Sequence, residues 1–180
     1  FFSGTLSAQE HGTGLLFNES LYEEIPQSVP LVTRSFTALP SSFSLKGYAP
    51  TPGSQGSQGS CVGWASTYGA KTIANAIRNN WKYNTTKINE NTFSPSFVYN
   101  QIRVNNKCQG AYIENAMKVL NTNGSVKLTD FPYDYRSCLK TPSTYVFEKA
   151  KSADLWLSPS YYPTMDALKQ ANTHYTQFDA

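Results

Sequence analysis

The chain has 180 residues, of which 39% are hydrophobic and 15% charged, and its formal net charge is +3. This is enough apolar material for one core. The charges form no basic block with interleaved aromatic residues, so nucleic-acid binding is not predicted. No apolar run approaches the roughly 20 residues that cross a bilayer. The mostly uncharged polar composition favours a secreted, periplasmic or cell-envelope protein.

Residues 1–38 differ from the rest of the chain. Several glycines and prolines interrupt any periodic pattern there, and Leu15–Tyr22 is predicted to form one or two helical turns at most. We therefore expect two parts, an N-terminal segment at 1–38 and a folded domain at 39–180.

A polar, glycine-rich loop at 55–60 leads directly into Cys61, and a helix is predicted from Cys61 to about Asn79. Apolar and small residues recur there at steps of three and four, which predicts one buried stripe. The members of this stripe are Ala65, Tyr68, Gly69, Ile73, Ala76 and Ile77. The Asn-rich stretch from Trp81 to Asn91 is predicted to be a surface loop.

Three further elements are predicted downstream. Ser94-Pro95 has the form of a helix start, with a cap followed by proline. Another helix is predicted from about Ala111 to Leu120, and Val126–Leu128 is expected to be extended. The region past Pro142 is mixed, with a short amphipathic helix predicted at Thr164–Ala171.

Cys61 is the candidate nucleophile. A thiol at a helix N-terminus lies among backbone N–H groups at the positive end of the helix dipole, which favours the reactive thiolate. Gln55 is a candidate amide donor for the oxyanion formed when a thiolate adds to an amide carbonyl. The alternatives are a buried structural cysteine and, for the donor, Gln58.

Four segments, in this order, resemble the papain-like cysteine peptidases. Leu39–Leu45 has the Leu-Pro form that opens the mature domain of that family. Gln55–Cys61 matches the family loop Gln-Gly-x-Cys-Gly-Ser-Cys at six of seven positions. Cys108–Ala111 occupies the place of the Cys-x-Gly-Gly turn, and Phe131–Asp134 that of a Tyr-Pro-Tyr segment.

The resemblance implies an α+β fold of papain-like type. The helical left-hand domain would be present and the right-hand β-barrel domain largely missing from this chain. It also implies peptide-bond hydrolysis through an acyl-enzyme on Cys61, with Gln55 in the oxyanion hole and a peptide or protein as substrate. Two alternatives stay open: a non-catalytic peptide-binding module, and a transpeptidase or acyltransferase that uses the same site.

The family resemblance also assigns the remaining candidate residues. Gln58 stands where the family has a cysteine, so the usual bridge cannot form and Cys108–Cys138 is expected instead. The alternative is two free thiols in a reducing compartment. Substrate is expected to lie along Gly110 and Ala111 as an added strand, and the alternative is a plain loop before a helix. The other candidate substrate-binding residues are Tyr112 and Ser60. Residues 1–38 would be an inhibitory propeptide, as in a zymogen, or a surface extension.

A general base is the missing component. In the family, the catalytic histidine follows the cysteine by about 130–150 residues, which places it beyond Ala180. The histidines present, His11 and His174, lack the expected surroundings. The missing His/Asn pair would come from a continuation of the chain or from a second chain, or the protein would be a non-catalytic relative. The spacing of the cysteines and histidines predicts no metal and no cofactor.

Overall fold

The computed structural model describes residues 14–23 and 42–153. These fall into two units, and the first contains residues 14–17 and 45–153. The second contains residues 18–23 and 42–44, and its helix α1 spans Glu19–Glu23. The predicted helix at Thr164–Ala171 and the predicted boundary at residue 38 lie outside the described residues.

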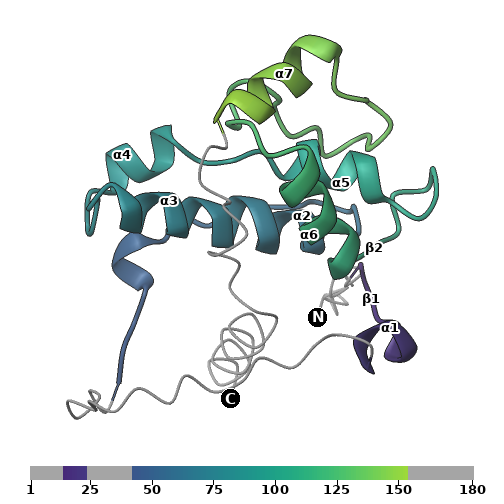
Figure 1. Cartoon of the computed structure of the whole chain (residues 1–180), viewed down its shortest axis with the longest axis horizontal. Coiled ribbons are helices and arrows are strands. Elements are labelled where there is room, and N and C mark those ends of the chain that lie inside the picture. Colours follow the sequence, from purple (N-terminus) through teal and green to yellow (C-terminus); the bar gives the residue numbers. More distant parts are fainter. Residues whose placement is uncertain (1–13, 24–41, 154–180) are drawn as a thin grey trace, which may run out of the picture. The chain divides into compact units, whose positions relative to one another are not determined.

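The first unit is built on one continuous helix that begins at Cys61 and ends at Arg78 (Figure 1). It consists of α2 (Cys61–Gly63), a π-helical segment η2 (Trp64–Lys71) and α3 (Thr72–Arg78). The predicted helix from Cys61 is therefore confirmed nearly to its end. A short 3-10 helix, η1 (Lys46–Tyr48), precedes it in the chain.

The predicted buried stripe of this helix is confirmed at Ala76, which is fully buried, but is wrong at Ala65 and Ile77. Ala65 is exposed and Ile77 is 40% exposed. Much of the buried face is polar and consists of Ser66, Thr67, Lys71 and Thr72. The hydroxyls of Ser66 and Thr72 tolerate burial because they are hydrogen bonded. Ser66 donates to the Val62 carbonyl at 2.6 Å, and Thr72 accepts from the Phe93 N–H at 3.1 Å.

Helix α5 (Pro95–Ile102) forms the centre of the core and begins where predicted. The Ser94 hydroxyl accepts from the Phe97 N–H at 3.1 Å and donates to the Phe131 carbonyl at 2.5 Å. Phe97, Val98 and Tyr99 are fully buried. The cap thus starts the helix and fastens it to the segment that carries Phe131.

The remaining helices surround this centre. Helix α6 (Ile113–Thr122) contacts α5 and α2, while α4 (Thr85–Glu90) contacts α3 (Figure 1). Helix α7 (Thr144–Ala153) brings Phe147 to 5.6 Å from the Phe97 ring centroid. Helix α6 begins two residues later than predicted. The predicted surface loop at Trp81–Asn91 contains α4, and the mixed region past Pro142 contains α7.

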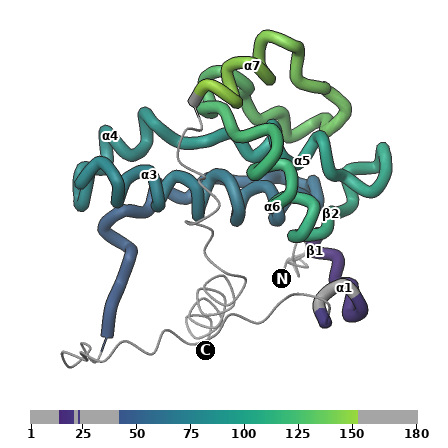
Figure 2. The backbone as a smooth tube through the Cα atoms, viewed as in Figure 1, coloured from purple at the N-terminus to yellow at the C-terminus, as the bar shows by residue number. Residues whose placement is uncertain are grey.

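The one sheet among the described residues is a pair of two-residue strands, β1 (Leu15–Leu16) and β2 (Ala111–Tyr112). The strands are neighbours in Figure 2. They run parallel, with Leu15 opposite Ala111 and Leu16 opposite Tyr112. The helical turns predicted at Leu15–Tyr22 are therefore wrong for the first two residues. Lys127 forms an antiparallel bridge with Phe93, in agreement with the extended segment predicted there. Helices with a small sheet are compatible with an α+β fold.

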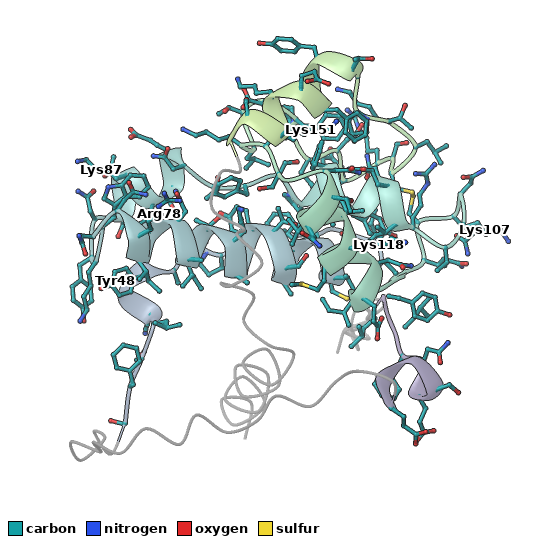
Figure 3. All side chains as sticks on the ribbon, in the orientation of Figure 1. Tyr48, Arg78, Lys87, Lys107, Lys118 and Lys151 are labelled. Carbon is teal, nitrogen blue, oxygen red and sulfur yellow. A yellow bond between two sulfur atoms is a disulfide. The ribbon has the colours of Figure 1, made fainter. Side chains whose placement is uncertain are left out.

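None of the helices in the described ranges is long and apolar enough to cross a bilayer. Five basic side chains labelled in Figure 3 lie on α3, α4, α6, α7 and the loop after α5. They are Arg78, Lys87, Lys118, Lys151 and Lys107. Positive charge is thus spread over separate elements.

Candidate active site

Cys61 is the first residue of the central helix and is half-buried. The first helical hydrogen bond here runs from the Trp64 N–H to the Ser60 carbonyl, at 3.1 Å. Ser60 itself is fully buried. The structure therefore has the predicted junction of a loop at 55–60 with a helix that starts at the thiol.

The electrostatics of Cys61 differ from the expectation. Burial raises the pKa of the Cys61 thiol above its usual value, although hydrogen bonds from the Val62 and Cys61 backbone lower it in part. The helix N-terminus therefore acts in the expected direction, but the loss of solvation outweighs it. In this state the thiol is predominantly protonated at neutral pH.

The loop before Cys61 is fastened by a hydroxyl pair. The Tyr133 hydroxyl donates to the backbone carbonyl of Gln55 at 2.8 Å, and it lies 2.6 Å from the Ser60 hydroxyl. The Tyr133 ring also contacts the Trp64 ring edge-on, with centroids 5.0 Å apart. Sequence reasoning named the segment 131–134 but gave Tyr133 no role, because nothing in the sequence shows which groups its hydroxyl reaches.

The two candidate glutamines lie in different surroundings. Gln58 is buried, and its side-chain amide donates to the Asp134 carbonyl at 2.5 Å. Gln55 is half-buried and six residues before Cys61. Because the Gln58 amide is already used within the fold, it is a weak candidate for an oxyanion donor.

The disulfide Cys108–Cys138 is present, as predicted, with the two Cα atoms 5.8 Å apart. Cys138 is fully buried, and its N–H donates to the Cys108 sulfur at 3.2 Å. The Cys108 carbonyl accepts from the Gly59 N–H at 2.8 Å. The disulfide thus holds the turn against which the loop before Cys61 rests.

Three glycines from three segments pack backbone against backbone beside this loop. A Cβ atom on Gly14 would lie 2.2 Å from the Gly59 carbonyl oxygen, and one on Gly59 would lie 2.6 Å from the Gln109 carbonyl oxygen. A Cβ on Gly110 would lie 2.7 Å from the Gly14 carbonyl oxygen. Side chains are excluded at such distances, so the contact requires glycine. The φ angle of +62° at Gly14 adds to this requirement.

The strand β1 therefore lies on the edge where substrate was expected. The Ala111 N–H donates to the Gly14 carbonyl at 2.9 Å. Gly110 and Ala111 are buried, and Tyr112 is half-exposed. The structure thus brings Gly110, Ala111 and the loop before Cys61 into direct contact, and a peptide segment of the same chain packs against both.

Tyr99 is a further residue near the thiol that the sequence did not indicate. It is fully buried and packs against Gly63, where an added Cβ would lie 3.0 Å from the Tyr99 Cβ. Burial, together with nearby Tyr133 and Cys61, raises the pKa of Tyr99 to about 12. It therefore stays neutral at physiological pH and cannot serve as a general base there.

His11 and His174 both lie outside the described residues. Within the described ranges, no group of three or more His, Cys, Asp or Glu residues is placed to hold a metal ion. The described part therefore offers a thiol at a helix start with neighbouring amide and backbone N–H groups, and it contains no histidine.

A separate cavity of about 520 Å³ lies at the far end of the central helix. Its lining residues are Asn75, Asn79, Trp81, Asn91, Phe93, Val126, Lys127, Thr129, Asp130 and Lys149. Its charged groups are paired within the wall: Lys149 with Asp130 at 2.5 Å, and Lys127 with the Asn91 side chain at 2.6 Å. The cavity does not include Cys61.

No family model matches this chain, and a search of curated proteins finds no significant similarity. Among solved structures, the chain is similar to xylellain, a cysteine protease from Xylella fastidiosa, with 20% sequence identity and a TM-score of 0.45. The match covers 63% of this chain and 53% of xylellain. The chain therefore spans about half of xylellain, and a similarity of this size does not by itself assign an activity.

Proposed function

We propose that the protein is a cysteine peptidase of papain-like type with Cys61 as its nucleophile. The observation that carries this proposal is a peptide segment, Gly14–Leu16, seated beside the nucleophile loop. It pairs with β2, and Gly14 packs against Gly59, two residues before the thiol. A peptide backbone therefore already fits next to Cys61, as hydrolysis of a peptide bond requires.

In the proposed reaction, the Cys61 thiolate attacks a peptide carbonyl carbon. The side-chain amide of Gln55 and the backbone N–H of Cys61 would stabilise the resulting oxyanion. A protonated histidine would then donate its proton to the departing amine, leaving an acyl-thioester that water hydrolyses. The histidine and its orienting Asn would come from outside the described residues, in the same chain or a partner.

The outward face of the central helix is the surface we assign to the histidine-bearing part. Ala65 and Ile77 are exposed on it, and Ile73 between them is half-buried. Apolar residues on one side of a helix favour packing against another element. In this proposal the described helices form the left-hand domain, and a barrel domain packs on this face.

We further propose that the N-terminal segment blocks the site before activation. Strand β1 occupies the edge formed by Ala111 and Tyr112 and is parallel to it. The raised pKa of the Cys61 thiol also supports this proposal, because a buried, protonated thiol is a poor nucleophile. Residues 1–38 would then act as a propeptide.

The experiment that tests the peptidase proposal is digestion of denatured casein by the full-length chain, with and without the partner or continuation that supplies the histidine. Products are identified by mass spectrometry. The Cys61→Ser variant is the control, since it keeps the fold but lacks the thiol. Cleavage that Cys61→Ser retains would assign the activity to another residue or a contaminant.

A non-catalytic peptide-binding module is the second candidate, and the same seated strand favours it. Such a module would bind peptides along β2 with equal affinity in wild type and Cys61→Ser, and it would release them uncleaved. A transpeptidase would instead form new amide products only when an amine acceptor is added. Mass spectrometry of the products separates all three functions.

A further inference from the structure

The Tyr133 hydroxyl has one proton, and its destination fixes the direction of two hydrogen bonds. A carbonyl cannot donate, so Tyr133 donates this proton to the Gln55 carbonyl at 2.8 Å. The contact of 2.6 Å between the Tyr133 and Ser60 hydroxyls must therefore use the proton of Ser60. The result is a directed chain from Ser60 through Tyr133 to Gln55.

This chain joins the two ends of the loop. Ser60 directly precedes the thiol, and Gln55 is the candidate oxyanion donor. The Cys108–Cys138 disulfide lies outside the loop, so it does not fix the spacing of these two ends. Gln58 adds a hydrogen bond to the neighbouring Asp134 carbonyl at 2.5 Å. The segment 133–134 thus holds the loop at three positions.

We propose that Tyr133 is a positioning residue that sets the distance between the oxyanion donor Gln55 and the nucleophile Cys61. It acts through Ser60 and the Gln55 backbone without touching substrate. This inference rests on the proposed peptidase function for its catalytic consequence, while the loop clamp itself is a property of the fold.

The Ser60 hydroxyl makes the clamp sensitive to a single change. Ser60 is fully buried, so when Tyr133 loses its hydroxyl, Ser60 loses its acceptor in a place that water does not reach. A buried polar group without a partner is costly, and the loop is expected to move until Ser60 finds one. That movement changes the geometry of the oxyanion hole, which matters most in the transition state.

The test compares Tyr133→Phe with Tyr135→Phe in the full-length chain. Both variants lose one phenol hydroxyl and keep the ring, but Tyr135 is 60% exposed. Hydrogen–deuterium exchange should be faster for the amides of residues 55–61 in Tyr133→Phe alone. In the active protein, kcat should fall about tenfold with KM unchanged within about twofold, as expected for an interaction made only in the transition state.

Ser60→Ala provides a second variant in case Tyr133→Phe does not fold. It should also lower kcat, and the double variant should be no worse than the more impaired single variant, because both act through one chain. Unchanged exchange at 55–61 in both variants would overturn the clamp, and a raised KM at constant kcat would overturn the positioning role. If the wild type cleaves no peptide, the peptidase proposal fails, and exchange alone decides the clamp.

Discussion

At the scale of single residues, two opposing effects act on Cys61. The start of the central helix supplies backbone N–H groups that favour the thiolate, and burial favours the protonated thiol. Burial dominates, so the pKa of Cys61 is raised. The sequence indicated the helix start but contained no information on how far the fold buries the thiol, so the expected direction of the shift differs from that in the structure.

The raised pKa has a direct kinetic consequence. Only the thiolate reacts with iodoacetamide, and a raised pKa lowers its fraction at any pH below that pKa. We expect the alkylation rate of Cys61 in the intact chain to keep rising with pH above about 8.5, the usual pKa of a cysteine, and to fall steadily below it. Mass spectrometry of the Cys61 peptide across pH 6–10 measures it. A rate that stays high at pH 6 would show that a thiolate exists, contrary to this account.

At the scale of elements, the packing of β1 depends on the glycine at its start, Gly14, and on the glycines it packs against. In Gly14→Ala, the new methyl carbon would lie 2.2 Å from the Gly59 carbonyl oxygen, far inside van der Waals contact, so β1 should leave its edge. Cys61 would then be better solvated, and its alkylation at pH 8 should be about threefold to tenfold faster, which corresponds to a pKa change of up to about one unit.

The matched control for this prediction is Gly69→Ala. Its added Cβ would meet only the Trp64 carbonyl oxygen, at 3.5 Å, which is an ordinary contact. The alkylation rate should be unchanged there. If Gly14→Ala behaves like Gly69→Ala, β1 does not shield the thiol.

Helix α5 depends on the Ser94 cap, which is buried and makes two hydrogen bonds. Ser94→Ala should lower the free energy of unfolding by about 2 kcal/mol, at the upper end for caps. The side chain of the exposed cap Asn84 of α4 accepts from the Lys87 N–H at 3.1 Å, so Asn84→Ala should cost about 1 kcal/mol or less. Urea titration measures both, and equal losses would contradict the central role of Ser94.

Some elements could be predicted because their signals are local. The helix at Ser94-Pro95 was predictable because the cap, the proline after it and the N–H that the cap accepts from all lie within residues 94–97. The helix from Cys61 was predictable because no proline interrupts that region. Its buried face was mispredicted because only apolar residues were counted, whereas Ser66 and Thr72 are buried with their hydroxyls bonded. Helix α4 was missed because Ile88 is its one buried apolar residue, and Asn-rich sequence is typical of loops.

The candidate site was predictable to a similar extent. Cys61 and Gln55 are placed by a contiguous loop, and the disulfide partner was predicted from the family resemblance. The Tyr133 hydroxyl reaches Ser60 and Gln55 from 73 and 78 residues away in the chain. No local pattern encodes contacts over such separations. The contact of Gly14 with Gly59 likewise depends on the tertiary fold.

At the scale of the whole molecule, the Cys108–Cys138 disulfide closes a loop with a sequence separation of 30 residues. On the chain-entropy model such a cross-link stabilises the folded state by about 3–4 kcal/mol. Reduction with dithiothreitol should therefore lower the urea midpoint substantially. Cys138→Ser should reproduce the loss, and a midpoint that reduction leaves unchanged would show that the cross-link contributes nothing to stability.

The central claim is that Cys61 is a nucleophile at a peptide-binding edge, and labelling by a peptidyl epoxide with a leucine side chain tests it most directly. The epoxide reacts well only with a thiolate beside a bound peptide, whereas iodoacetamide reacts with any exposed thiolate. The account predicts a mass increase on the Cys61 peptide in the complete, histidine-bearing protein, faster in Gly14→Ala and absent in Cys61→Ser. Labelling of Cys61 by iodoacetamide but never by the epoxide would contradict it.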